Sequence, residues 1–115
     1  MDDNNKKMYL FNVLKGKWRL LIIESLFTGE KQFGEIHQSI KGVSAKVLTE
    51  NLQYLIRSGI ISKRTYPIFP PKTIYKLSDR GMNIKPILDD IYRWSIENYT
   101  PLQEEVTDEF YNIFQ

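Results

Sequence analysis

Residues 33–76 read FGEIHQSIKGVSAKVLTENLQYLIRSGIISKRTYPIFPPKTIYK, and the pattern of this stretch decides the fold. A short helical pattern, a turn and a longer amphipathic helix precede two runs typical of strands, which a proline-rich turn joins. Residues 41–76 hold seven basic residues against one acid, a net charge of +6 in a chain whose total is +2. The stretch therefore predicts a helix pair and a β-ribbon that share a basic surface.

The longer helix of this stretch is predicted over residues 45–58, with one apolar and one polar side. Its apolar side is predicted to comprise Ala45, Leu48, Leu52, Leu55 and Ile56. Ser44 is the expected N-cap, because its hydroxyl can accept a hydrogen bond from a free backbone N–H of the first turn. Gly59 is expected to end the helix.

The rest of the chain is predicted to be mainly helical, with residues 1–7 frayed. Further helices are expected over 8–14, 17–27, 33–40 and 79–98, a short one with Leu102, Val106, Phe110 and Ile113 in register, and strands over 60–66 and 73–77. Pro86 should kink the helix over 79–98 or start a second one, because proline inside a helix costs about 3 kcal/mol. We predict one domain over residues 1–115. The helix pair and the ribbon belong to its core at 17–77, whose basic surface suits a polyanion such as DNA and makes this the DNA-binding core; the apolar terminal helices at 8–14 and 79–114 are predicted to be dimerisation helices.

Composition excludes several classes of function. The chain has 115 residues, no cysteine and one histidine, so disulfides, thiol chemistry and a multi-histidine metal site within one chain are excluded. Neither a signal peptide nor an apolar run of the ~20 residues that a membrane span needs is present, which favours a cytoplasmic protein. No nucleophile–base pair or phosphate-cradling glycine loop stands out, so no catalytic residue, metal or cofactor is predicted.

The helix pair and the ribbon suit recognition of double-stranded DNA. The major groove is about 12 Å wide and admits one helix, which buries one face on its own domain and offers polar groups from the other. The candidate DNA-binding residues are Ser44, Ala45, Lys46, Thr49, Glu50, Gln53 and Arg57 on the helix, and Lys63, Arg64 and Lys72 on the ribbon. Glu50 would repel phosphate, so it should face a cytosine amino group or pair with Lys46.

Each of these features also has an interpretation without DNA. Any solvated helix face carries polar residues, and lysines on a hairpin protect edge strands from aggregation. An acidic segment at residues 104–109 lowers the net charge, so the whole chain is only modestly basic. His37 is interpreted as a solvated or backbone-bonded side chain rather than a catalytic group.

The terminal segments hold more aromatic and apolar side chains than a small domain easily buries. The candidate dimer contacts are Met8, Phe11, Leu14, Tyr92, Trp94, Tyr99 and Phe110. A filled core within one chain is the alternative. We favour a homodimer, because two copies can bind two half-sites a helical turn apart.

Several motifs together resemble the HxlR family of bacterial winged-helix, MarR-like transcription regulators. They are Gly16-Lys17-Trp18, Phe33–Ile36, Ser44–Leu52, Gly59-Ile60-Ile61, Tyr66-Pro67 with Pro70-Pro71, Tyr75–Ser78, Gly81 and Pro86–Trp94, within residues 11–97. The resemblance implies a winged helix-turn-helix fold, mainly α with a small β-wing, and a homodimer on a promoter palindrome. It also implies that residues 44–53 enter the major groove while the wing, residues 66–72, approaches the minor groove.

One departure from the resemblance bears on regulation. Many family members carry a cysteine before the Gly-Lys-Trp motif, and the corresponding region around Asn5 has none. A small-molecule effector, constitutive action and control through protein level stay open. We predict a sequence-specific regulator, a repressor, that is not an enzyme; a winged-helix module for protein interaction or ligand sensing is the alternative.

Overall fold

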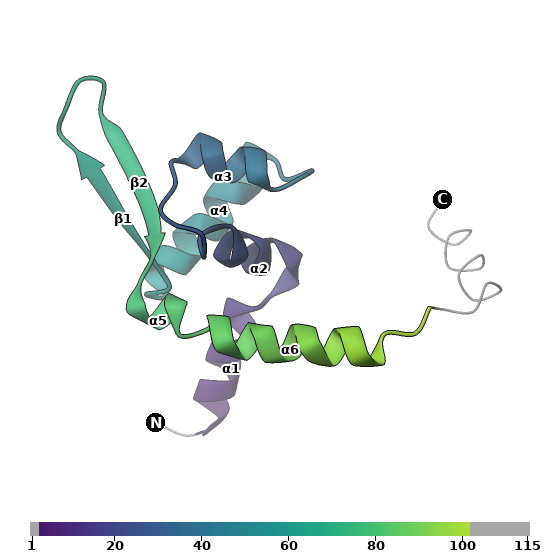
Figure 1. Ribbon diagram of the computed structural model, residues 1–115. Helices are drawn as coiled ribbons and strands as arrows, with labels where there is room; N and C mark the ends of the chain where they lie inside the picture. Colours follow the sequence, from purple (N-terminus) through teal and green to yellow (C-terminus); the bar gives the residue numbers. More distant parts are fainter. Residues whose placement is uncertain (1–2, 102–115) are drawn as a thin grey trace. The chain divides into compact units, whose positions relative to one another are not determined.

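The computed structural model describes residues 3–101, which form six helices and two strands. Figure 1 shows α1 (Asp3–Val13), α2 (Gly16–Ser25), α3 (Phe33–Ser39), α4 (Ala45–Arg57), β1 (Ile61–Tyr66), β2 (Lys72–Leu77), α5 (Asp79–Met82) and α6 (Lys85–Asn98). The chain divides into two compact units, Met1–Lys85 and Pro86–Gln115, and one domain over residues 1–115 stays a prediction. No helix within residues 3–101 combines the length and apolar character needed to cross a membrane.

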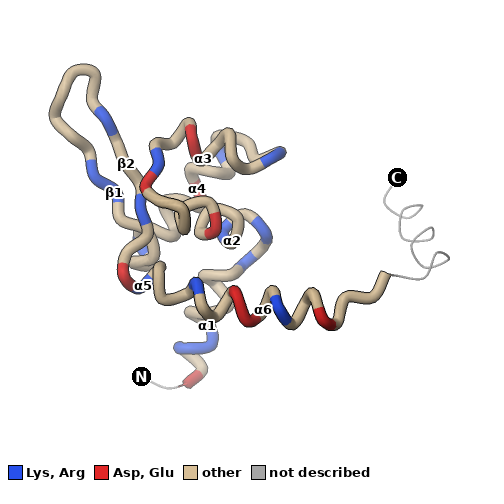
Figure 2. The backbone as a smooth tube through the Cα atoms, in the orientation of Figure 1, with Lys and Arg blue, Asp and Glu red and all other residues tan. Residues whose placement is uncertain are grey.

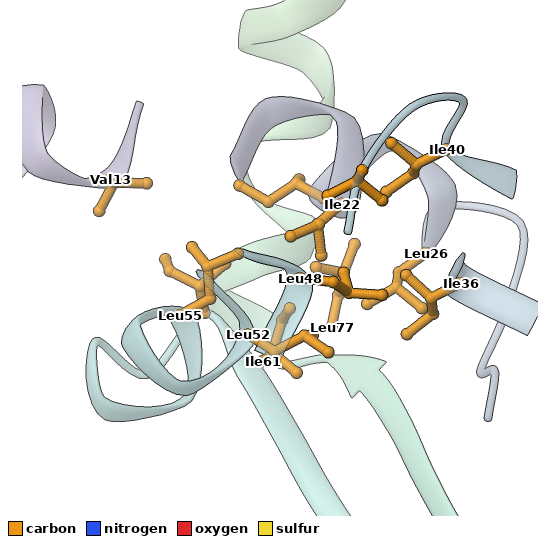
Figure 3. Close-up of a cluster of buried hydrophobic side chains, with 13 residues drawn as sticks. Val13, Ile22, Leu26, Ile36, Ile40, Leu48, Leu52, Leu55, Ile61 and Leu77 are labelled. Carbon is orange, nitrogen blue, oxygen red and sulfur yellow. The ribbon is translucent and has the colours of Figure 1, made fainter. Parts of the chain in front are cut away.

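The core of the first unit consists of aliphatic side chains from α1 to α4 and from the base of the ribbon. Thirteen buried residues among those described form one cluster (Figure 3): Val13, Ile22, Ile23, Leu26, Ile36, Ile40, Val43, Leu48, Leu52, Leu55, Ile60, Ile61 and Leu77. Removing one such side chain from water contributes about 1.5–3 kcal/mol. The cluster therefore holds α2, α3 and the ribbon on one side of α4.

Helix α4 has the amphipathic pattern and the caps that its sequence predicts. Leu48, Leu52 and Leu55 are at most 2% exposed. The Ser44 hydroxyl accepts a hydrogen bond from Val47 N at 3.1 Å, an arrangement worth about 1 kcal/mol. Gly59 follows the helix with φ +78°, a conformation that glycine adopts without steric cost. Ala45 differs from its predicted place on the apolar side, because it lies in the first turn beyond the core and is exposed.

The turn between α3 and α4 is held by local hydrogen bonds. Glu35 accepts one from the backbone N of Gln32 at 2.9 Å, which completes a capping box at the start of α3. His37 Nε2 lies 2.9 Å from the Val43 carbonyl, so the histidine is backbone-bonded, as one of its two predicted interpretations states. The contact of His37 with Val43 spans the short connection between α3 and α4, whereas the capping box fixes the start of α3.

Strands β1 and β2 form an antiparallel ribbon in continuous register, from Ile61 opposite Leu77 to Tyr66 opposite Lys72. Paired residues lie on the same face, and the face alternates along each strand. Lys31 adds an isolated bridge to β2 through two hydrogen bonds with Tyr75, of 2.9 and 2.8 Å. Lys31 thus contributes one bridge beside β2 rather than a third strand.

A close backbone contact fixes the end of the ribbon to α5. The Ser78 hydroxyl accepts from Gly81 N at 3.1 Å and donates to backbone carbonyls of residues 59 and 60. Gly81 is buried, and a Cβ atom built on it would collide with the Ile60 carbonyl oxygen. Only glycine fits this contact without a shift of the backbone.

Several predicted boundaries differ from those of the structure. Helix α1 begins at Asp3 rather than at residue 8, although 3–7 have no apolar periodicity. Helix α2 ends at Ser25, two residues earlier than expected. The predicted helix over 79–98 is interrupted after Met82 and restarts at Lys85, because Pro86 has no N–H to donate but is tolerated in a first turn. The helix expected around Val106 lies outside the described residues.

Candidate nucleic-acid interface

Helix α4 presents a continuous exposed face opposite its buried leucines. All seven helix candidates are exposed: Ser44, Ala45, Lys46, Thr49, Glu50, Gln53 and Arg57. Lys46, Thr49, Glu50, Gln53 and Arg57 recur at intervals of three or four residues, which places them along one side of the helix, and Ser44 and Ala45 lie at its N-terminal end. The structure therefore brings the predicted helix residues together on one surface, while their contacts with DNA stay a prediction.

Two hydroxyl groups of this face already have backbone partners. Thr49 Oγ1 donates to the Ala45 carbonyl at 2.8 Å, and Ser44 Oγ serves as the cap of α4. In residues 3–101, Lys46 and Glu50 form no ion pair. Lys46, Glu50, Gln53 and Arg57 are thus the side chains of this face whose polar ends extend into solvent.

The first ribbon candidate, Lys63, lies beside α4. Lys63 on β1 and Gln53 on α4 line the same small cavity of about 80 Å³, together with Thr49, Phe33 and Tyr75. Lys63 pairs with Tyr75 and therefore points to the face of the ribbon that meets α4. One cation of the ribbon therefore lies next to the polar face of α4.

The other two ribbon candidates lie on the opposite face. Arg64 pairs with Ile74, and Lys72 pairs with Tyr66. Because side chains alternate between the two faces along a strand, Arg64 and Lys72 share the face opposite to that of Lys63. The Arg64 guanidinium lies 4.9 Å from the centre of the Tyr66 ring, a favourable cation–π geometry. The three predicted ribbon cations therefore do not form one cluster, since the pleat separates Lys63 from Arg64 and Lys72.

The electrostatic character of the surface is positive along the ribbon. Lys and Arg occur on both strands in Figure 2, and Lys63, Arg64, Lys72 and Lys76 are all exposed. Glu30 lies near this ribbon, since it lines a cavity with Arg64 and Lys76. Sequence reasoning missed Glu30, because only the bridge of Lys31 to β2 brings the preceding loop to this face.

Arg19 is a further residue that sequence reasoning missed. Its Nε donates to Asn51 Oδ1 at 3.0 Å, and its guanidinium carbon lies 3.7 Å from the centre of the Tyr54 ring. Arg19 also donates to the Asn12 carbonyl at the end of α1. It thereby connects α1 and α2 to α4, and no local motif marks an arginine for such a role.

The candidate dimer contacts differ in exposure. Met8 and Phe11 on α1 are 53% and 59% exposed, and Trp94 and Tyr99 near the other end of the chain are 65% and 78% exposed. Tyr92 is also exposed, whereas Leu14 packs against the core cluster. Part of the Leu14 side chain is therefore covered by the core, and its contact with a partner, like that of the other candidates, stays a prediction. Phe110 lies outside the described residues.

Two kinds of side-chain grouping bear on chemistry in the described part of the chain, namely metal ligands and buried polar groups. No group of three or more His, Cys, Asp or Glu side chains within residues 3–101 could hold a metal ion. The buried side chains there are all apolar.

Helices α2, α3 and α4, with a short turn between α3 and α4, are followed by a two-stranded ribbon. This arrangement defines a winged helix-turn-helix protein. The family description that matches residues 13–103 is HxlR-like helix-turn-helix. The chain belongs to this family. The resemblance inferred from its motifs is thereby confirmed.

Individual relatives agree with this assignment. An uncharacterized HTH-type transcriptional regulator of Methanothermobacter thermautotrophicus is 36% identical over 83 residues, which are 72% of this chain and 63% of that protein. The chain thus spans less than two thirds of that relative. YkvN of Bacillus subtilis, an uncharacterized HTH-type transcriptional regulator, is 33% identical over 85% of this chain and 81% of its own.

A solved structure matches the fold as well. The reduced form of the transcriptional regulator YodB from B. subtilis is 31% identical, with a TM-score of 0.77 over 85% of this chain and 96% of that chain. YodB has also been solved after treatment with diamide, a thiol oxidant. The winged-helix architecture predicted for this chain is confirmed by this likeness.

Proposed function

We propose that this protein is a DNA-binding transcriptional regulator whose helix α4 enters the major groove. The observation that carries the proposal is the exposed polar face of α4, with Lys63 of the ribbon beside Gln53. Membership of a family whose named relatives are HTH-type transcriptional regulators supports the same function. Cations on the ribbon would neutralise phosphates, while Lys46 and Gln53 reach base edges.

The finer part of the proposal is a homodimer that represses from a promoter palindrome. Exposed apolar side chains on α1 and α6, such as Phe11 and Trp94, support a partner, because clusters of exposed apolar side chains mark interaction sites. Two copies would present two α4 helices to half-sites about 34–36 Å apart. Repression would follow where the site overlaps a promoter.

We propose further that the signal controlling this regulator is not the oxidation of a thiol in this chain. The chain contains no cysteine, so it offers no thiol to an oxidant of the kind applied to YodB. We propose that a bound small molecule or the amount of protein sets its activity. Thermal-shift screens with metabolite pools would identify an effector through a raised melting temperature.

Binding of a fluorescent duplex, followed by anisotropy at several salt concentrations, tests the proposed function. Lys63→Ala and Lys6→Ala remove the same charge, and Lys6 is an exposed residue of α1 outside the candidate surface. Lys63→Ala should weaken binding, while Lys6→Ala should leave it close to that of the parent protein. Equal effects of both variants would show that only net charge matters, against a specific interface.

A further inference from the structure

The loop at the end of the ribbon exposes two large apolar side chains. Phe69 is 98% exposed and Ile68 is 57% exposed, between the strand ends Tyr66 and Lys72. Figure 1 shows this loop at the end of the ribbon remote from the helices. A phenylalanine that makes almost no contact with its own chain retains the full driving force for burial elsewhere.

The loop is stiff and its apolar side chains are presented on a fixed base. Pro67, Pro70 and Pro71 flank the two apolar residues, and each proline ring fixes one backbone φ angle. The pairing of Tyr66 with Lys72 closes the ribbon directly below the loop. A stiff loop loses little conformational freedom on binding, so more of the contact energy remains as affinity.

The surroundings of this apolar tip favour a polyanion as its partner. Residues 63–76 contain Lys63, Arg64, Lys72 and Lys76 and no acid. Lys72 lies at the base of the tip and Arg64 lies on the same face of the ribbon, while Lys63 lies further back on the other face. Glu30 is the one acid found beside this face, so cations outnumber acids around the tip in the described part of the chain. An apolar protein surface would accept Ile68 and Phe69 but would not neutralise the adjacent cations, whereas the phosphates of DNA would.

DNA offers both parts of this complement in its minor groove. The groove is about 6 Å wide, which excludes a helix but admits a narrow loop, and phosphates line both of its edges. Apolar side chains, phenylalanine among them, are able to insert between base pairs there, where they unstack one step and bend the duplex. The exposed ring of Phe69 and the nearby cations Lys72 and Arg64 match these two requirements.

We propose that Phe69, assisted by Ile68, is a wedge that enters the minor groove, partly unstacks one base step and bends the bound DNA. This inference rests on the proposed function, and it adds a specific deformation to DNA binding. Sequence preference would then include a flexible pyrimidine–purine step under each tip, because such steps unstack most easily.

The experiment uses a duplex of about 30 base pairs that the full-length parent protein has selected from a random library. Anisotropy reports affinity, energy transfer between dyes on the two ends reports bending, and 2-aminopurine placed along the site reports unstacking. The variants are Phe69→Ala and Phe69→Leu. Met82→Ala is the control, because Met82 is an exposed apolar residue, 41% accessible, on α5.

We expect the parent protein to raise 2-aminopurine fluorescence at one step in each half-site and to bring the duplex ends closer together. Phe69→Ala should abolish both signals and weaken binding about tenfold, as expected from the lost burial of an aromatic ring. Phe69→Leu should retain part of each signal, and Met82→Ala should retain them fully.

Two results would overturn the inference in distinguishable ways. In the first, the parent protein binds DNA without bending or unstacking it, and Phe69→Ala binds with the same affinity as the parent. This result would contradict the wedge and leave the proposed function intact. In the second, the parent protein enriches no sequence and binds no duplex at low salt, which would contradict both the wedge and the proposed function. A changed sedimentation coefficient of Phe69→Ala without DNA, with unchanged DNA shape and affinity, would assign the tip to contact between copies instead.

Discussion

Arg19 on α2 donates its Nε to Asn51 Oδ1 on α4 at 3.0 Å, across 32 positions of sequence. The same guanidinium lies against the ring of Tyr54, one helical turn further along α4. Asn51 in turn donates to the Val47 carbonyl at 2.8 Å. The half-buried side of α4 is therefore fixed by a polar link, beside the apolar contacts of its leucines.

Loss of this link should loosen α4 from α2. We predict that Arg19→Ala lowers the free energy of unfolding by about 1–2 kcal/mol, because it removes a charged hydrogen bond and a cation–π contact. Urea unfolding of Arg19→Ala, Asn51→Ala and the double variant measures the coupling, expected at about 0.5–1.5 kcal/mol. Strictly additive effects of the two substitutions would contradict a direct link.

The contact of Gly81 with the Ile60 carbonyl predicts a strong effect on stability. Gly81→Ala should lower the free energy of unfolding by about 1–3 kcal/mol, since the methyl group forces the backbone apart. Gly34→Ala is the matched control, because Gly34 lies in α3 with no atom within 4 Å of the added Cβ. It should be neutral or stabilising by up to about 1 kcal/mol. Thermal unfolding measures the stability of both variants. Equal stabilities of Gly81→Ala and Gly34→Ala would contradict the predicted effect of this contact.

The separation of ribbon cations onto two faces predicts distinct effects of single substitutions. Lys63→Ala should reduce the salt dependence of DNA binding by about one counterion, and Arg64→Ala should do the same independently. The double variant should then show the sum of the two effects, because the side chains lie on opposite faces. Affinities measured over a salt series provide the slopes, and a double variant no weaker than either single one would indicate a shared contact.

Gln53→Ala should act on sequence preference rather than on general affinity. A glutamine amide can bind adenine through two hydrogen bonds. Its loss should therefore reduce the difference in binding free energy between selected and random DNA by about 1–3 kcal/mol. Competition binding with both duplexes measures this ratio. An unchanged ratio would place Gln53 outside the groups that contact bases.

The exposed aromatic residues of α6 predict the oligomeric state. We expect Trp94→Glu to shift the protein from dimer to monomer in sedimentation equilibrium, because a buried carboxylate would oppose an apolar interface. Glu97→Gln, on the same helix and also exposed, serves as the control and should leave the dimer intact. A parent protein that sediments as a monomer at all concentrations would contradict the proposed homodimer.

Sequence patterns predicted the parts of the fold that depend on local chemistry. The periodic leucines, the Ser44 cap and Gly59 define α4 within a residue of its observed limits, because each signal acts inside the helix itself. The early start of α1 had no such signal, since residues 3–7 are polar. Contacts with distant segments hold α1 instead, among them the hydrogen bond that the Tyr9 hydroxyl donates to the Ser58 carbonyl at 3.0 Å.

Only part of the candidate site was predicted, because only part of it depends on local sequence patterns. Exposure of the polar face of α4 follows from helical periodicity, whereas the two faces of the ribbon depend on strand register, which fixes Lys63 opposite Tyr75. The link from Arg19 to Asn51 and the approach of Glu30 to the ribbon join distant segments. Such long-range contacts arise from packing and leave no local pattern.

The most direct test of DNA binding through α4 and the ribbon is the affinity of the full-length protein for a duplex selected from a random library, measured by anisotropy over a range of salt. We predict tight binding at low salt and a linear fall of log K with log salt, with a slope of about −0.9 for each phosphate neutralised. Weaker, equally salt-dependent binding should be seen with random DNA. A protein that enriches no sequence, or whose binding does not change with salt, would contradict the assignment of α4 and the ribbon as a DNA-binding surface.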